Sequence, residues 1–270
     1  MQTKQIIDRI KDNRKSLEFI PTGFKKLDKS LDGGFLKKEL VVIGGGTGAG
    51  KSYLAIHLSD QAVVAGFKVG YFSLEISNEL VVARILGMRS GLKASHILYG
   101  LEDAGDIQYN KAIGHVLGMG SLFETLDDVY ELKEIDRKIR EYAFEFVVID
   151  FVQNVMDQRS DSYERLSYVA LHLQKIAKEL NCCILILSQL SNAVSKANGE
   201  ERPLEYKGSG SIATVADLGF FLDFVDKELV LETDPNVSVY HLLLQKNRRG
   251  PSKIMTQLKV KWPGGAFYEC

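Results

Sequence analysis

A glycine-rich segment between an apolar run and a helical pattern places the strongest constraint on how this chain folds. Residues 45–52 read Gly-Gly-Thr-Gly-Ala-Gly-Lys-Ser, which fits the pattern G-x-x-x-x-G-K-[ST]. Residues 40–43 before it are Leu-Val-Val-Ile, and a helix-like stretch follows over 53–65. The alternative is a glycine-rich turn that binds nothing. Strand, loop, helix, lysine and serine are all in register, however, so the segment predicts a nucleoside triphosphate site.

The residues of this loop have distinct expected roles. The ammonium group of Lys51 is expected to reach the β- and γ-phosphates, and the hydroxyl group of Ser52 to bind Mg²⁺. The glycines let backbone N–H groups turn towards the phosphates, and the positive end of the helix dipole adds to this attraction. The expected nucleotide-binding residues of the loop are Gly45, Gly46, Thr47, Gly48, Ala49, Gly50, Lys51, Ser52 and Tyr53.

Apolar runs alternate with helical patterns along most of the remaining sequence. Strands are expected at residues 40–44, 69–74, 146–149, 182–187, 219–224 and 239–244. Helices are expected at residues 52–65, 78–89, 127–142 and 163–180, whereas 92–118 shows no clear pattern. This alternation predicts an α/β fold whose central sheet is mostly parallel and flanked by helices. Hairpin-like segments within 219–262 predict an antiparallel edge near the C-terminus.

Composition narrows the class of protein further. The 270 residues carry a net charge of −1, so contact with a polyanion has to use a local patch. There are three cysteines, and two of them, Cys182 and Cys183, are adjacent in an apolar run, which indicates a reducing cytosol and not a disulfide scaffold. No signal peptide and no run of membrane-spanning length is present. We therefore expect a cytoplasmic protein without a membrane partner.

Polar residues follow the predicted buried strands, where ligands bind in open α/β sheets. Asp150 follows four apolar residues and is expected to hold Mg²⁺ together with Ser52, although a strand-end turn former is the alternative. Phe151 stands where many ATPases carry a catalytic glutamate. Glu75, at the end of another strand, is therefore the candidate general base, with a helix-capping acid as its alternative. Gln189 is expected to sense the γ-phosphate.

Two later segments are candidates for contact with other molecules. The loop 191–206 and the Gly/Ser run after it combine exposed backbone N–H groups with lysines, which suits phosphate-backbone contact, but a flexible surface loop is an alternative. The cationic cluster in 245–251 is either a solvated hairpin tip or an arginine finger for a neighbouring subunit. The expected DNA-binding residues are Lys196, Lys207, Gly208, Ser209 and Gly210.

Taken together, these motifs resemble the RecA-type ATPase domain of DnaB-family replicative helicases. The resemblance covers roughly residues 17–268, and the motifs occur in the family's order. They are Pro21-Thr22-Gly23-Phe24 with Leu27-Asp28, Gly45–Ser52, Ser73-Leu74-Glu75, Ile149-Asp150-Phe151-Val152-Gln153, Ser188-Gln189-Leu190, Arg202-Pro203 with Gly208-Ser209-Gly210-Ser211-Ile212 and Ala216-Asp217, and Lys246-Asn247-Arg248 followed by Gly250-Pro251.

The resemblance implies a RecA-like P-loop NTPase core in which Glu75 is the catalytic base. It also implies that Lys246 and Arg248 reach the nucleotide of a neighbouring subunit, with Arg248 and not Arg249 as the finger. Lys51 and Gln189 complete the expected catalytic set. Two departures stand out. The DNA-loop motif Arg-Glu-Ser-Gly reads Lys-Gly-Ser-Gly at 207–210, and the family's helical N-terminal domain is missing from this sequence.

The expected organisation is an N-terminal linker helix over residues 1–18 and a RecA-like ATPase domain over 19–270. By resemblance, the expected function is a replicative helicase motor. It would hydrolyse ATP or another NTP with Mg²⁺ in a hexameric ring and move 5′-to-3′ on single-stranded DNA. A primase or loader would be a further partner, in the cytoplasm of a bacterium or phage-infected cell.

Two alternatives of a different kind remain. One is a RecA/RadA-like recombination ATPase that forms filaments. The other is a non-motor regulatory ATPase that binds protein, which the near-neutral charge favours. A small-molecule kinase and a GTPase fit less well, because the sequence lacks an arginine-rich lid and an Asn-Lys-x-Asp motif.

Overall fold

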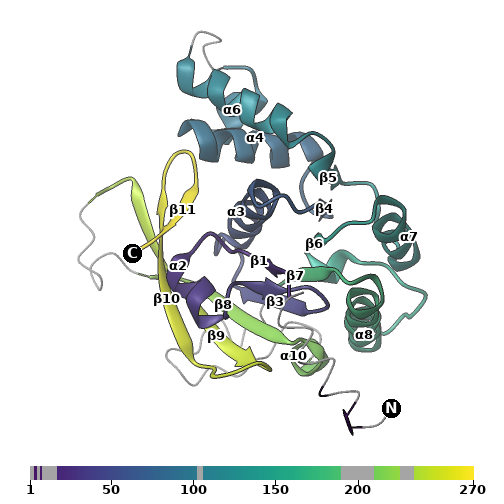
Figure 1. The fold of residues 1–270 in the computed structure, drawn as a ribbon. Coiled ribbons are helices and arrows are strands. Elements are labelled where there is room, and N and C mark those ends of the chain that lie inside the picture. The colour runs from purple at the N-terminus through teal and green to yellow at the C-terminus, as the bar shows by residue number, and fades with distance from the viewer. Residues whose placement is uncertain (1–2, 5–6, 8–16, 102–105, 190–209, 226–233) are drawn as a thin grey trace.

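The computed structural model describes residues 3–4, 7, 17–101, 106–189, 210–225 and 234–270. Within this part of the chain, a nine-stranded sheet forms the centre of the molecule, and a two-stranded sheet of β1 (Phe19–Ile20) and β2 (Phe35–Leu36) lies beside it (Figure 1). The order of strands across the large sheet is β11 (Ala266–Glu269), β10 (Ile254–Lys261), β9 (Val237–Asn247), β8 (Leu218–Val225), β3 (Leu40–Gly45), β7 (Cys183–Gln189), β6 (Phe146–Asp150), β4 (Val69–Ser73) and β5 (Phe123–Leu126).

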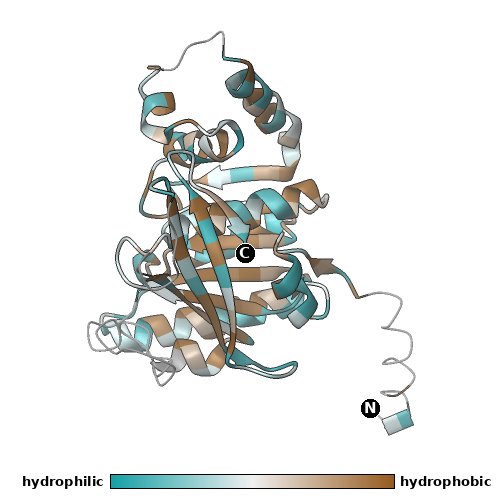
Figure 2. Ribbon diagram, turned by 90° about the vertical axis from the view of Figure 1, so that its left-hand side faces the viewer, coloured by the Kyte–Doolittle hydropathy of each residue, from teal (hydrophilic) through white to brown (hydrophobic). Residues whose placement is uncertain are grey.

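The direction of the strands divides this sheet into two parts. From β8 to β5 every neighbouring pair is parallel, whereas β9, β10 and β11 pair antiparallel with their neighbours. Strands β3 and β6 are buried at every position, as expected for parallel strands covered on both faces. Residues of β9 and β10 largely alternate between buried and partly exposed, which gives the striped hydropathy of these strands in Figure 2.

Helices cover both faces of the sheet. Their bounds are α2 (Lys25–Ser30), α3 (Lys51–Val64), α4 (Asn78–Ser90), α5 (Ala94–Leu98), α6 (Ile107–Met119), α7 (Leu132–Tyr142), α8 (Ser162–Leu180) and α10 (Gly210–Val215). One hydrophobic cluster joins α2 and α3 to one face and to β9–β11, and a second joins α7, α8 and α10 to the other face. Helices α4 and α6 pack together beyond α3, at the top of Figure 1.

Local signals explain where several helices begin. Ser77, Asp106 and Asp161 precede α4, α6 and α8, and the side chain of each accepts a hydrogen bond from a backbone N–H in the first turn. Helix α4 ends at Gly91, whose φ of 82° is a left-handed conformation that glycine adopts without a steric penalty. These caps satisfy backbone groups that the helices themselves leave unpaired.

The predicted fold class is confirmed, and the differences from the predicted elements have physical causes. The helix predicted for 127–142 begins at Leu132. The first residue of the predicted helix, Asp127, instead binds the start of α4: its carboxylate accepts hydrogen bonds of 2.9 Å from the backbone N and the Nδ2 of Asn78. The unassigned range 92–118 contains α5 and most of α6, and β5 forms an edge strand that the sequence did not reveal. The predicted linker helix over 1–18 lies almost wholly outside the described residues.

None of the helices in the described ranges is both long enough and apolar enough to cross a lipid bilayer.

A histidine in α3 makes the stability of this fold depend on pH. The ring of His57 stacks on Phe24 at 4.7 Å between centroids, and burial lowers its pKa from 6.5 to about 4. Between these two pH values the unfolded chain binds a proton that the folded chain does not, so stability falls as the pH drops from 6.5 towards 4.

We expect the substitution His57→Leu to flatten this pH dependence. The free energy of unfolding of the wild-type protein should decrease relative to that of the variant by roughly 2 kcal/mol between pH 7 and pH 5. Urea unfolding at the two pH values measures the difference. Parallel pH profiles for the two proteins would contradict a neutral, desolvated His57.

Candidate nucleotide-binding site

The glycine-rich loop connects β3 to α3 as the sequence predicts. Gly50 lies at the N-cap of α3 with φ of 82°, and Gly48 has φ of 75°, so both need the left-handed conformation. The ammonium Nζ of Lys51 donates hydrogen bonds to the carbonyl oxygens of Gly45 (3.1 Å) and Gly46 (2.8 Å). Burial lowers the pKa of Lys51, whereas nearby Asp150 and Glu75 favour its charged form. The loop therefore holds a partly desolvated cation at the N-terminus of a helix, a binding site for polyphosphate.

A cavity of about 300 Å³ opens over this loop. It lies at the carboxyl ends of the parallel strands, and it brings together the loop, the candidate base, the candidate metal ligands and the candidate γ-phosphate sensor. The lining residues are Thr47, Gly48, Ala49, Gly50, Lys51, Ser52, Tyr53, Glu75, Ile76, Arg84, Asp150, Phe151, Gln189, Tyr240 and Trp262.

The carboxylate of Asp150 is the buried anion of this cavity. The residue is 2% exposed, its Oδ2 accepts a hydrogen bond of 2.7 Å from the hydroxyl of Tyr71, and a second hydrogen bond joins it to the side chain of Ser52. Burial raises the pKa of Asp150, because a desolvated carboxylate is costly without a compensating cation. A hydroxyl and a carboxylate oxygen in contact are ligands that suit Mg²⁺, which takes further oxygens from phosphates and water. The residues present therefore fit this ion.

No group of three or more acidic, histidine or cysteine side chains with metal-ligand geometry occurs in the described part of the chain. A structural zinc or calcium cage is thus not built into these residues. A hydroxyl–carboxylate pair is instead typical of a metal that arrives with its nucleotide.

Glu75 and Gln189 lie at the ends of β4 and β7, near the glycine-rich loop. Glu75 is exposed on the cavity wall two residues beyond β4, which pairs with β6, the strand of Asp150. The Nε2 of Gln189 donates a hydrogen bond to Oγ1 of Thr47, so it joins β7 directly to the loop. Gln153 supports this end of β7, since its Nε2 donates to Oγ of Ser188 at 2.9 Å.

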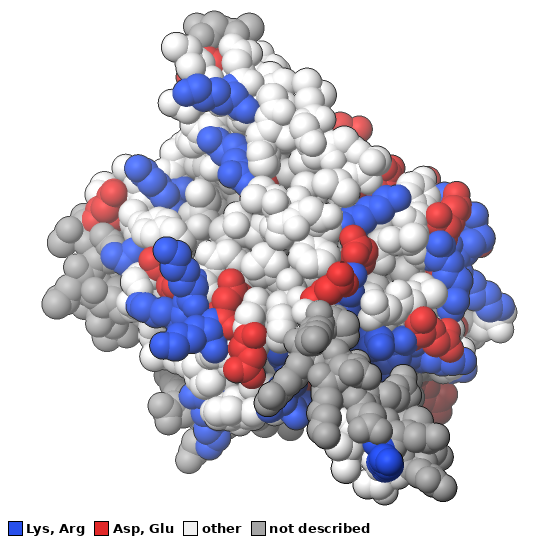
Figure 3. Space-filling view, viewed as in Figure 1, with Lys and Arg blue, Asp and Glu red and all other residues white. Residues whose placement is uncertain are grey.

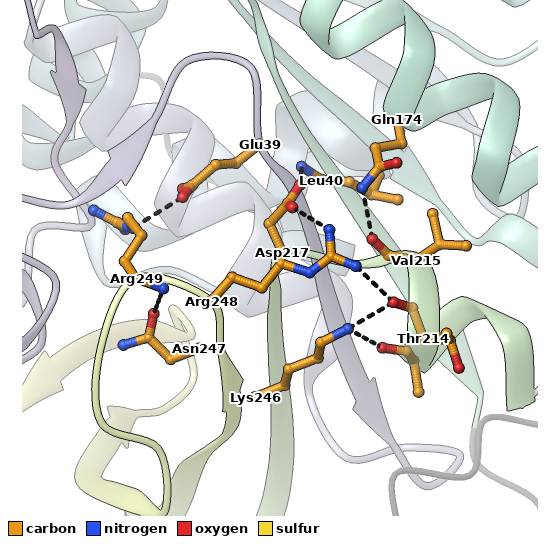
Figure 4. A network of polar contacts seen from close by, with 11 residues as sticks. Glu39, Leu40, Gln174, Thr214, Val215, Asp217, Lys246, Asn247, Arg248 and Arg249 are labelled. Atoms are coloured by element: carbon orange, nitrogen blue, oxygen red, sulfur yellow. Dashed lines mark hydrogen bonds and ion pairs between the residues drawn. The ribbon is translucent and has the colours of Figure 1, made fainter. Parts of the chain in front are cut away.

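Lys246 and Arg248 lie towards the amino-terminal ends of the parallel strands, whereas the loop lies at their carboxyl ends, and Figure 4 shows both cations beside Thr214. Lys246 pairs with Gly219 at the start of β8. Because β8 runs parallel to β3, this end of β8 lies beside the amino-terminal half of β3. Through Gly219, Lys246 is level with Val42 of β3, about 10 Å along the strand from Gly45, and Arg248 lies two residues further from the loop, about 17 Å away. Neither is among the described residues that line the cavity. In their own chain both cations bind carbonyl oxygens of α10 and lie outside the cavity of Lys51.

The guanidinium group of Arg248 is held in place but accessible. Its NH1 donates to Oδ1 of Asp217 at 2.9 Å, its NH2 donates to the carbonyl oxygen of Thr214 at 2.9 Å, and its side chain is 45% exposed. The Nζ of Lys246 donates to the carbonyl oxygens of Ala213 and Thr214, both at 2.7 Å. Both cations therefore sit at the end of α10 (Figure 4).

Arg249 has a different environment from its neighbour Arg248. Its guanidinium group pairs with Glu39 at 2.9 Å and donates to the carbonyl oxygens of Leu31 (2.8 Å) and Gly34 (2.9 Å). The side chain is only 17% exposed, so its donors are used within the chain. Arg249 therefore ties the β9–β10 connection to the segment between α2 and β2.

Comparisons with known proteins agree with this geometry. The sequence profile of the DnaB-like helicase C-terminal domain matches residues 19–263. The chain belongs to this family. It is 28% identical over 282 aligned positions to the replicative DNA helicase DnaC of Bacillus subtilis (strain 168), with 97% of this chain and 59% of that protein covered. It thus spans little more than half the length of this curated relative.

Two solved structures share the fold of this DnaB-like chain. One is an ATPase domain with a TM-score of 0.85 at 22% identity, and the match covers 100% of this chain and 99% of that one. The other is a DnaB-like replicative helicase, solved in a study of its interactions with primase. It has a TM-score of 0.82 at 22% identity and is covered to 67% of its length. The RecA-like architecture predicted from the sequence is therefore confirmed.

The structure of the DnaB-like chain also reveals cavity residues that the sequence did not single out. Tyr71, Arg84, Tyr240 and Trp262 lie in or under the cavity and belong to none of the motifs. Tyr71 falls within the strand expected at 69–74, and Tyr240 within the one expected at 239–244. No motif marks any of them. What they share is an aromatic or cationic side chain that the fold places next to the glycine-rich loop. The sequence does not reveal this proximity.

Most of the predicted DNA-binding segment lies outside the described residues, namely Lys196, Lys207, Gly208 and Ser209, while Gly210 is the first residue of α10. That helix packs against α8, where Nε2 of Gln174 donates to the carbonyl oxygen of Val215 at 2.7 Å. On the face shown in Figure 3, the described lysines and arginines are interspersed with acids, without a continuous basic surface.

Proposed function

We propose that this chain is the ATPase motor domain of a ring-shaped replicative helicase, which hydrolyses ATP between adjacent subunits and moves along single-stranded DNA with 5′-to-3′ polarity. One observation carries the proposal. The cavity holds a phosphate loop, a candidate base and a metal-binding pair, while Lys246 and Arg248 lie across the sheet. Two copies in head-to-tail contact would bring Arg248 of one to the cavity of the other, and such contacts form a ring when the rotation between copies closes and a filament when it does not.

The residues of the proposed site divide between nucleotide binding and hydrolysis. The backbone of the loop and Lys51 bind the β- and γ-phosphates. Ser52 and Asp150 would hold Mg²⁺, which supplies charge neutralisation to the phosphate oxygens when bound. The carboxylate of Glu75 orients the attacking water and accepts its proton, and the amide of Gln189 contacts the γ-phosphate. Arg248 from the neighbouring subunit stabilises the charge that develops on the transferred phosphoryl group.

The remaining parts of the proposal concern partners. Because this chain spans just over half of its curated relative, a primase or a loader would contact either this domain or parts of a longer protein. We propose a hexameric ring, with DNA contacts from 196 and 207–210, working in the cytoplasm of a bacterium or a phage-infected cell. The mixed charge in Figure 3 is the observation that favours the second candidate, a regulatory ATPase that binds protein.

One experiment separates these functions. The ATPase rate is measured with and without single-stranded oligo(dT), and the mass in solution is measured with a non-hydrolysable nucleotide and Mg²⁺. A motor is expected to hydrolyse ATP several-fold faster with DNA and to form a closed oligomer. The Lys51→Ala variant is the control, and it should show no hydrolysis under either condition. A rate that is indifferent to DNA would favour the regulatory ATPase, and open filaments on DNA would favour a recombinase.

A further inference from the structure

Tyr71 lies beneath the nucleotide cavity, and the tasks proposed above leave it unused. It is the middle residue of β4 and is fully buried. Its hydroxyl group donates a hydrogen bond of 2.7 Å to Oδ2 of Asp150, the carboxylate proposed to hold Mg²⁺. Tyr71 is not among the described residues that line the cavity, so it can act on a ligand only through Asp150.

The register of the sheet explains how this tyrosine reaches the carboxylate. Strands β4 and β6 are parallel neighbours, and Ser73 lies opposite Asp150. Tyr71 comes two residues before Ser73, so it lies about 7 Å back along the strand and one strand spacing, about 5 Å, across. Tyr71 and Val148 belong to the hydrophobic cluster on the face that α3 covers. Asp150 shares this face, because it follows Val148 by two residues, and a tyrosine side chain spans the diagonal between them.

The carboxylate of Asp150 is held from two sides. One hydrogen bond comes from Tyr71 on β4, and another joins Asp150 to the side chain of Ser52 on the first turn of α3. Ser73, although directly opposite Asp150, uses its hydroxyl group to donate to the carbonyl oxygen of Ile76. Tyr71 is therefore the donor that β4 supplies. A carboxyl group turns easily about its terminal bond, and a donor on one oxygen limits this rotation.

We propose that Tyr71 is a positioning residue, whose hydroxyl group fixes the orientation of the Asp150 carboxylate so that it binds Mg²⁺ together with Ser52. This rests on the proposed function, since it assumes that the ion arrives with a nucleotide. Removing a partner that orients a metal ligand typically costs 10- to 100-fold in metal affinity or activity. Mg²⁺ is sensitive to such a loss, because it requires near-ideal octahedral geometry, whereas Ca²⁺ accepts irregular arrangements of ligands.

The burial of Tyr71 favours this role. Its ring belongs to the cluster that includes Ile56 of α3 and Ile85 of α4, and no part of it reaches solvent. The fold therefore sets the position of the hydroxyl group before an ion binds. The alternative is that the hydrogen bond only satisfies a buried hydroxyl group. In that case its removal would lower stability without changing the preference for one metal ion over another.

The substitution Tyr71→Phe removes the hydroxyl group and keeps the ring. Binding of a non-hydrolysable ATP analogue is measured by calorimetry with EDTA, with Mg²⁺ and with Ca²⁺. The variant should lose roughly 10-fold or more in affinity for the Mg²⁺ complex, lose less for the Ca²⁺ complex, and bind the metal-free analogue like the wild type. Thermal unfolding without nucleotide measures any loss of stability separately.

Two further variants separate positioning from stability. Tyr71→Leu also lacks the hydroxyl group, so its affinity for the Mg²⁺ complex should match that of Tyr71→Phe, although the shorter side chain lowers the melting temperature further. Asp150→Asn should itself weaken the Mg²⁺ complex, and adding Tyr71→Phe to it should cause no further loss. The control Tyr142→Phe removes a hydroxyl group on α7, away from the cavity, and should bind like the wild type.

Three results would overturn the inference. These are an unchanged affinity of Tyr71→Phe for the Mg²⁺ complex, equal losses for the Mg²⁺, Ca²⁺ and metal-free forms, or additive losses from Tyr71→Phe and Asp150→Asn. Failure of the proposed function looks different, because the wild type would then bind the nucleotide no better with Mg²⁺ than with EDTA. Circular dichroism of each variant establishes that it is folded.

Discussion

Arg248→Ala is expected to lower the rate of ATP hydrolysis by about 10³-fold or more while ATP still binds. A guanidinium group placed at the γ-phosphate stabilises charge that exists only in the transition state, and removing such a finger costs 10³- to 10⁵-fold in other NTPases, about 4–7 kcal/mol. In its own chain Arg248 lies across the sheet from the cavity, so the whole of this effect has to come through a neighbouring subunit. The turnover number and the affinity for ATP, measured separately, test this expectation.

The chain offers two matched controls for this variant. Arg137, on α7, is 56% exposed and paired with Glu134 and Glu141, so Arg137→Ala removes an arginine of similar exposure without touching the proposed interface. It should hydrolyse ATP at the wild-type rate. Arg249→Ala removes a largely buried ion pair with Glu39 and should lower the melting temperature instead. Wild-type hydrolysis by a folded, assembled Arg248→Ala protein would contradict the finger assignment.

Glu75→Gln is expected to reduce the turnover number by roughly 10²- to 10⁴-fold, the contribution of a positioned general base. Glutamine keeps the size of the side chain and one acceptor oxygen, but it cannot accept the proton of the attacking water. The carboxylate of Glu75 lines the same cavity and repels the phosphates of a bound nucleotide, so its neutralisation should leave ATP affinity the same or slightly higher. Single-turnover hydrolysis and equilibrium ATP binding test the two halves of this prediction. Hydrolysis at the wild-type rate would instead support the helix-capping role.

Mixing the two variants tests whether one active site is built from two chains. In a mixed assembly, an Arg248→Ala subunit keeps Glu75, and its Glu75→Gln neighbour supplies an intact Arg248. Such an interface has a complete set of residues, so activity should reappear on mixing and rise with the fraction of mixed contacts. If both residues act within a single chain, the mixture stays as inactive as its components.

The sequence alone predicted the polar part of the site, because each of its residues belongs to a local pattern. A glycine-rich loop between a strand and a helix predicts a phosphate site, and Glu75, Asp150 and Gln189 follow apolar runs that end at one edge of a parallel sheet. The alternating pattern likewise predicted the parallel core and the antiparallel edge. The irregular range 92–118 and the short strand β5 gave no such signal, since neighbouring elements and not local periodicity hold them in place.

Tertiary structure decided what no pattern in the chain records. The cluster Lys246-Asn247-Arg248-Arg249 reads as four adjacent polar residues, yet the fold uses Arg249 to bind Glu39 and leaves Arg248 accessible at the edge opposite the cavity. The cavity lining brings together Tyr53, Tyr240 and Trp262, which are far apart in sequence. Local patterns identified the candidate residues, because a loop motif or a polar residue after an apolar run can be recognised from its neighbours along the chain. Which of these side chains face the cavity depends on the order of the strands, and long-range packing sets that order.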